Sequence, residues 1–147
     1  MPVSSFNIIS TNARSITPKI ENFIDYSNEL KANLAFLTET WLSDSDELFS
    51  DLEQLELATG YSMLCKNCPP NSRGNSTGGI ALVFKKSHIT FKEIVLPGND
   101  FEILFAIGTM PRFTRKMIAI CVYMPPGICY QMLGVFNGRN TGIKRKI

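Results

Sequence analysis

The chain has 147 residues, of which 44% are apolar and 19% charged, and its formal net charge is +2. This length and composition suit one globular domain with a single core and exclude a disordered chain. The small net charge excludes a protein that coats nucleic acid through bulk charge. It leaves open an enzyme that meets nucleic acid through one local patch.

The N-terminal sequence has no basic segment followed by a long apolar run, so we expect no signal peptide. No apolar run approaches the roughly 20 residues that a membrane-spanning helix needs. We therefore expect an intracellular chain without membrane contact, or a piece of a larger protein. The sequence does not distinguish a nuclear from a cytoplasmic location.

A strand, a helix and a second strand are predicted in the first part of the chain. Residues 4–11 alternate in polarity as a strand does. Residues 17–33 have an amphipathic helical pattern, with Thr17 as the expected N-cap and Pro18 at the first helical position. Residues 34–38 are continuously apolar, as in a strand buried on both faces. This order predicts a βαβ-like unit.

The middle of the chain is predicted to be mainly β-structure. A short helix or irregular segment at 44–61 leads into a strand at 61–65 and an exposed loop rich in Pro, Asn, Ser and Gly at 66–79. Two antiparallel strand pairs are then expected, 78–86 with 88–96 and 100–109 with 116–124. We predict one domain part over 5–126 and an atypical, poorly ordered tail over 127–147.

The four cysteines are Cys65, Cys68, Cys121 and Cys129. Cys65 and Cys68 are spaced as two zinc ligands can be, but a structural zinc site needs a second pair at comparable spacing. Cys121 lies within an apolar strand pattern. Reduced thiols are therefore the default interpretation for an intracellular chain, with structural zinc as the alternative.

Glu39 directly follows the apolar strand at 34–38. Open α/β folds place ligand-binding groups at the carboxyl ends of their strands. A single carboxylate there suits Mg²⁺, which keeps several waters and takes one or two protein carboxylates. The alternative is structural: Glu39 caps the next turn or pairs with a surface lysine.

Two further polar residues end predicted strands. Asn12 ends the first strand and would lie beside Glu39 if the two strands are parallel neighbours; its amide can serve a metal or a phosphate. Tyr123 precedes a Pro-Pro stop, where its phenol could bond a phosphate oxygen or a leaving group. The structural alternatives are a turn asparagine and a half-buried tyrosine at a strand edge.

Arg73 and His88 are weaker candidates. Arg73 lies in the Gly-rich loop, which could approach a nucleic-acid backbone, or which could simply be flexible. His88 is the only histidine. No carboxylate lies near it in sequence, so we interpret it as a turn residue and not as a catalytic base.

Several stretches, in order, resemble the endonuclease/exonuclease/phosphatase family. They are NIISTNARSI, LAFLTETWL, GGIALVFKK, FEILFAI and IAICVYMPP. The N-A-R-S and L-T-E-T-W-L runs resemble most closely the endonuclease domain of LINE-type non-LTR retrotransposons. The resemblance covers Phe6 to Pro126, which corresponds to the N-terminal half of a full domain.

The resemblance implies an α/β (α+β) fold, a two-sheet β-sandwich with flanking helices, truncated here after about half the domain. It implies that Glu39 binds Mg²⁺ or Mn²⁺, that Asn12 and Tyr123 are active-site residues, and that Arg73 lies near a substrate loop. It also implies DNA as the partner. An inner apolar sheet face without its covering half would favour self-association.

The sequence departs from the family pattern in its later part. The Gly-Asp-Phe-Asn-like and Ser-Asp-His-like turns of the family are absent, and Val135 stands where the first would need its Asp. A general base is therefore missing. We expect a fragment of a Mg²⁺-dependent DNA endonuclease domain that is inactive as it stands. The alternatives are a non-catalytic nucleic-acid-binding remnant and a phosphoesterase acting on a small or lipid phosphate ester.

Overall fold

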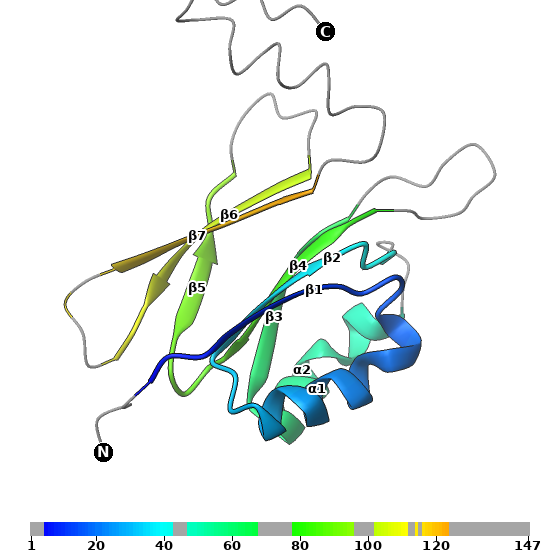
Figure 1. Ribbon diagram of the computed structural model, residues 1–147, viewed down its shortest axis with the longest axis horizontal. Helices are drawn as coiled ribbons and strands as arrows, with labels where there is room; N and C mark the ends of the chain where they lie inside the picture. Colours follow the sequence, from blue (N-terminus) through cyan, green and yellow to red (C-terminus); the bar gives the residue numbers. More distant parts are fainter. Residues whose placement is uncertain are drawn as a thin grey trace, which may run out of the picture.

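The computed structural model describes residues 5–42, 47–67, 78–95, 102–111, 114 and 116–123. Within these residues it is a mixed α/β structure of two sheets flanked by helices, which confirms the predicted fold class (Figure 1). The predicted tail at 127–147 and the loop residue Arg73 lie outside the described residues.

Sheet A has four strands in the order β1-β2-β4-β3, and sheet B has three in the order β5-β6-β7. Only the β1–β2 pair is parallel among the described pairs. The elements are β1 (Ile8–Asn12), a 3₁₀ turn (Thr17–Lys19), α1 (Ile20–Glu29), β2 (Leu34–Thr38), α2 (Glu47–Thr59), β3 (Tyr61–Lys66), β4 (Ile80–Lys85), β5 (Thr90–Glu93), β6 (Glu102–Thr109) and β7 (Lys116–Tyr123).

The predicted βαβ-like unit is present, and its register places Asn12 opposite Thr38. The predicted helix start is wrong. Thr17 opens the 3₁₀ turn and makes no side-chain cap, and Pro18 lies in that turn. The Lys19 ammonium binds the carbonyl oxygens of Ala13 and Arg14 at 2.9 Å each, which holds the turn against the preceding loop. The α-helix therefore begins only at Ile20.

The predicted pairing of residues 78–86 with 88–96 is also wrong. Strand β4 lies between β2 and β3 in sheet A, whereas β5 pairs with β6 in sheet B. The short turn between β4 and β5 thus carries the chain from one sheet to the other. The reason is burial: β4 is buried at five consecutive positions and needs neighbours on both edges and both faces, while β5 is half exposed.

Two apolar layers hold the structure together. Helices α1 and α2 cover one face of sheet A, and sheet B covers the other (Figure 1). The first layer packs Ile16 and Ile24 against alternate residues of β2 and β4. The second lies between the sheets and comprises Leu34, Ile80, Leu82, Phe84, Ile89, Leu104, Ala106, Ala119 and Cys121.

The outer face of β7 is apolar and exposed. Ile118, Ile120 and Val122 are 63%, 53% and 42% exposed. They are ladder partners of Ile107, Phe105 and Ile103 on β6, so the apolar surface continues across two strands. Among the described residues, no helix is long and apolar enough to span a membrane.

Candidate active site

Glu39 directly follows β2, at the carboxyl end of the parallel strands β1 and β2. Its φ is +52°, and that of Trp41 is +55°, a left-handed conformation that residues other than glycine seldom adopt. Such a conformation persists only where the surroundings impose it, and it is concentrated at functional sites. The backbone at 39–41 is therefore expected to be held from outside.

Backbone hydrogen bonds hold this segment from two sides. On the β1 side, the amides of Ser15 and Ile16 donate to the carbonyls of Glu39 and Thr40, each at 3.0 Å. On the β4 side, the amides of Thr40 and Trp41 donate to the carbonyls of the two residues before β4, at 3.2 and 2.9 Å. The segment is thus clamped between the loop after β1 and the turn before β4.

Tyr123 reaches Glu39 from the other sheet. It is the last residue of β7, and its hydroxyl donates a 2.7 Å hydrogen bond to Glu39 Oε1. The two residues are 84 positions apart in the chain. The structure therefore brings two of the predicted site residues into direct contact, at the point where sheets A and B meet.

Asn12 is the third predicted residue at this point. Its Oδ1 accepts the Arg14 backbone amide at 3.2 Å, and its side chain also hydrogen-bonds Glu39. Because an ionised carboxylate only accepts hydrogen bonds, the amide nitrogen of Asn12 is the group that donates to Glu39. Asn12 consequently serves as an orienting donor, with its carbonyl oxygen turned to the local backbone.

These donors favour the ionised form of Glu39. The Tyr123 hydrogen bond and then that of Asn12 lower the pKa of the Glu39 carboxyl, burial opposes them, and the Arg14 charge adds the smallest effect, which also lowers the pKa. Glu39 is thus a carboxylate at neutral pH that is oriented by two neutral donors. An oxygen ligand of this kind fits a hard divalent cation.

The sequence interpretation did not single out Arg14 or Glu102. Arg14 has a φ of +44°, is exposed, and lies close enough to influence Glu39. Glu102 is 8% exposed and begins β6. Signals for both were present: Arg14 follows Asn12 by two positions, and Glu102 falls on the inward-facing parity of an otherwise apolar strand.

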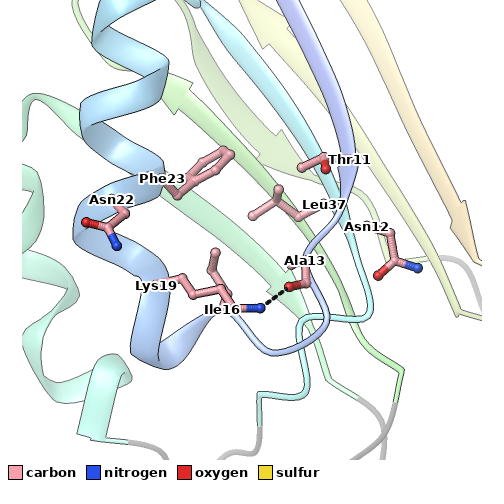
Figure 2. A pocket seen from close by; sticks show the side chains of 8 residues that line it. All are labelled: Thr11, Asn12, Ala13, Ile16, Lys19, Asn22, Phe23 and Leu37. Atoms are coloured by element: carbon pink, nitrogen blue, oxygen red, sulfur yellow. Dashed lines mark hydrogen bonds between the residues drawn. The ribbon is translucent and has the colours of Figure 1, made fainter.

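A cavity of about 320 Å³ adjoins the site. It lies between α1 and the end of β1, and Asn12 is common to the cavity lining and to the Glu39 cluster (Figure 2). Figure 2 shows the Asn12 side chain directed away from Phe23 and Leu37, which form the apolar part of the lining. Asn12 thus faces Glu39 while its backbone borders the cavity.

His88 lies at the far end of the sheet. Its Nδ1 is 2.5 Å from the side-chain nitrogen of Asn33, which precedes β2, whereas Glu39 follows that strand. His88 therefore has a structural partner and no contact with the Glu39 site. Arg73, the predicted substrate-loop residue, lies outside the described residues.

The described residues contain no group of three or more His, Cys, Asp or Glu side chains placed to hold a metal. Cys65 and Cys121 are free thiols. Burial raises their pKa values to about 12 and about 11, respectively, with Glu93 and Glu102 adding to the effect. Cys68 and Cys129, the other members of the alternative zinc site, lie outside the described residues.

No protein-family model and no curated protein matches the sequence. Several solved structures match the fold. The 3′ phosphatase NExo from Neisseria, bound to a product DNA hairpin, superposes with a TM-score of 0.54 at 15% identity, over 88% of this chain and 48% of its own. An AP endonuclease from Archaeoglobus fulgidus gives 0.51 at 16%, over 82% and 42%.

The endonuclease domain of TRAS1, a telomere-specific non-LTR retrotransposon, gives a TM-score of 0.50 at 12% identity, over 89% of this chain and 52% of its own. The fold is that of the endonuclease/exonuclease/phosphatase enzymes. The chain spans about half the length of the solved structures it matches. The resemblance drawn from the sequence motifs is confirmed at the level of fold.

Proposed function

We propose that this chain is the cation-binding part of a Mg²⁺-dependent DNA endonuclease domain of the retrotransposon type. The observation that carries the proposal is the ionised Glu39 at the end of β2, oriented by Tyr123 and Asn12. Three proteins of the same fold, a 3′ phosphatase solved with a DNA hairpin, a retrotransposon endonuclease domain and an AP endonuclease, support the choice of DNA as substrate.

The residues present fit a hard divalent cation. Glu39 would hold Mg²⁺ or Mn²⁺ through its carboxylate, which the Tyr123 phenol orients. A bound cation would neutralise charge on the non-bridging oxygens of a phosphodiester. Tyr123 and Asn12 keep the carboxylate ionised and fix its direction.

Arg14 would supply the contact to the nucleic-acid backbone. Its guanidinium carries a permanent charge, is exposed, and lies near Glu39. A contact of this kind positions a phosphate without reading sequence. Arg73 remains a second proposed substrate contact, as the sequence motif implies.

We further propose that the chain does not cleave DNA by itself. The sequence lacks the later turns that supply the general base and its partner, and His88 is held at the far end of the sheet. Without a base to activate water, a cation and a phosphate contact alone give little hydrolysis. The chain would then bind a cation and DNA weakly and leave the phosphodiester intact.

The test combines cation binding with plasmid nicking. We expect Mn²⁺, followed by its electron paramagnetic resonance signal, to bind one site that Glu39→Gln abolishes and that Glu93→Gln, on β5, leaves intact. Supercoiled plasmid with Mg²⁺ should stay supercoiled, with and without EDTA. Absence of a Glu39-dependent site would overturn the proposal of a cation site.

The nicking assay also separates the alternatives. Nicking that EDTA and Glu39→Gln both abolish would contradict the proposed inactivity and require an unrecognised base. DNA affinity that falls steeply with salt, with no cation site, would favour a nucleic-acid-binding remnant. Hydrolysis of a small or lipid phosphate ester without action on DNA would favour a phosphoesterase.

A further inference from the structure

Glu102 is a buried carboxylate at the interface of the two sheets. It is 8% exposed and begins β6, ahead of the inward-facing Leu104, Ala106 and Gly108. Its Oε2 accepts the backbone amide of Gly79 at 2.7 Å. A buried carboxylate is costly unless it has hydrogen-bond donors, so this contact fixes Glu102 and Gly79 relative to each other.

The turn that Glu102 binds is shaped for close approach. Gly78 and Gly79 have φ values of +78° and +84°, which favour glycine. A Cβ at Gly78 would collide with the Glu102 carboxylate, and one at Gly79 would lie 2.5 Å from Thr40 Oγ1. Only a chain without side chains at these two positions can pass between Glu102 and the segment that follows Glu39.

The same two glycines hold the segment after Glu39. The Gly79 carbonyl accepts the Thr40 amide at 3.2 Å, and the Gly78 carbonyl accepts the Trp41 amide at 2.9 Å. A continuous path of hydrogen bonds therefore runs from Glu102, through the amide and carbonyls of the turn, to the backbone at 40–41. That backbone directly follows Glu39 and includes Trp41, and both residues have left-handed conformations.

Sheet B contacts the site through two residues that face each other. Glu102 and Tyr123 are ladder partners on β6 and β7, so their side chains lie on the same face. Tyr123 binds the Glu39 carboxylate itself. Glu102 binds the turn that holds the backbone of Thr40 and Trp41, directly after Glu39.

We propose that Glu102 is a positioning residue of the Glu39 site: by binding the Gly79 amide, it fixes the turn that holds the backbone at 40–41, directly after Glu39. The proposal rests on the proposed function only in taking Glu39 as the cation ligand. Its geometric part concerns the backbone and can be tested without a cation.

The experiment compares Glu102→Gln and Glu102→Ala with Glu93→Ala, a control acid on β5 of the same sheet. Gln keeps a side-chain oxygen that can accept the Gly79 amide, and Ala removes it. Backbone amide chemical shifts of Gly79, Thr40 and Trp41 report the path directly. Trp41 is the only tryptophan, so fluorescence emission gives a second readout at the same place.

We expect Glu102→Ala to shift all three amides and the Trp41 emission and to weaken Mn²⁺ binding about 10- to 100-fold, as loss of a group supporting a ligand does. Glu102→Gln should restore these signals, and Glu93→Ala should not change them. Unchanged amides in Glu102→Ala, or shifts in Glu102→Gln as large as those in Glu102→Ala, would overturn the proposal.

If Glu102→Ala does not fold, hydrogen exchange of the Gly79 amide in the wild-type chain and in Glu102→Gln still tests the proposal. In the wild-type chain and in Glu102→Gln, the Gly79 amide should exchange slowly with D₂O although it precedes β4. Fast exchange in either would overturn the inference. Failure of the wild-type chain to bind Mn²⁺, with the amide results as expected, would instead contradict only the proposed function.

Discussion

The Tyr123 hydroxyl lies 2.7 Å from Glu39 Oε1, although the two residues are on different sheets. The contact fixes the direction of the carboxylate and favours its ionised form. It also means that the site exists only when both sheets are in place. The following predictions test this contact, the glycine turn beside it, and the surfaces around it.

Tyr123→Phe should raise the pKa of the Glu39 carboxyl towards its ordinary value, because the mutation removes the largest cause of its depression. Side-chain ¹³C chemical shifts of Glu39 followed against pH would measure this. The contribution of Glu39 to stability is present above its unfolded-state pKa near 4.5 and is lost as pH falls through the lower folded value.

The variant should therefore lose less stability than the wild-type chain on acidification below about pH 4.5. Tyr26→Phe, an exposed tyrosine on α1, is the matched control and should leave the Glu39 titration unchanged. An unaltered Glu39 titration in Tyr123→Phe would contradict the assigned contact.

Gly79→Ala should destabilise the chain more than Gly60→Ala. Both positions have positive φ, +84° and +73°, so both variants carry a backbone penalty of about 1 to 2 kcal/mol. The Cβ at Gly60 meets no atom within 4 Å, whereas that at Gly79 would overlap the Thr40 hydroxyl. Overpacking of this kind adds about 1 to 3 kcal/mol.

Urea unfolding followed by circular dichroism would measure both free energies. Equal losses in the two variants would show that the turn before β4 can move away from Thr40. We expect that movement to be opposed, because the turn is hydrogen-bonded to Glu102 on one side and to Thr40 and Trp41 on the other.

The outer face of β7 should cause self-association. Ile118, Ile120 and Val122 form a continuous apolar row on an edge strand, and exposed rows of this kind are sites of strand pairing and aggregation. Ile120→Lys should lower the weight-average mass measured by sedimentation at increasing concentration. Leu57→Lys, at an isolated exposed leucine on α2, should leave it unchanged.

Equal effects of the two lysine variants, or a wild-type mass that does not depend on concentration, would contradict the role of β7. The apolar row would then be exposed without mediating self-association.

Cys65 and Cys121 should resist alkylation in the folded chain. Their pKa values of about 12 and about 11 leave very little thiolate at pH 8, and the thiolate is the reactive form. Iodoacetamide labelling followed by peptide mass spectrometry should modify both only in denaturant. Rapid native labelling of Cys65 would contradict the raised pKa of its thiol.

The sequence predicted the parts of the site that local pattern determines. A strand, a helix and a strand of the right length brought Asn12 beside Glu39, because a crossover helix makes the two strands parallel neighbours. The position of Tyr123 could not be derived from pattern, since it depends on how the two sheets pack. Its place before the Pro-Pro stop made it a candidate, and the family resemblance implied its active-site role.

Two errors have physical causes that the sequence already showed. The five-residue apolar run of β4 indicated a central strand buried on both faces, which a simple hairpin with β5 would not provide. Glu102 places a charge in the otherwise apolar inward-facing row of β6, and the sequence pattern alone assigned it no role beyond the strand. A charged residue in such a row needs a buried partner, here the Gly79 amide.

The layer between the sheets has a consequence for how the site could be lost. Glu39 is attached to one sheet, while Tyr123 and Glu102 are attached to the other, and apolar side chains such as Leu104 fill the layer between the sheets. A slight parting of the sheets would separate the polar groups while each sheet kept its own ladder. The site would thus be lost before the secondary structure is. Truncating an apolar side chain in the layer between the sheets, such as Leu104, would therefore disrupt the site without touching it.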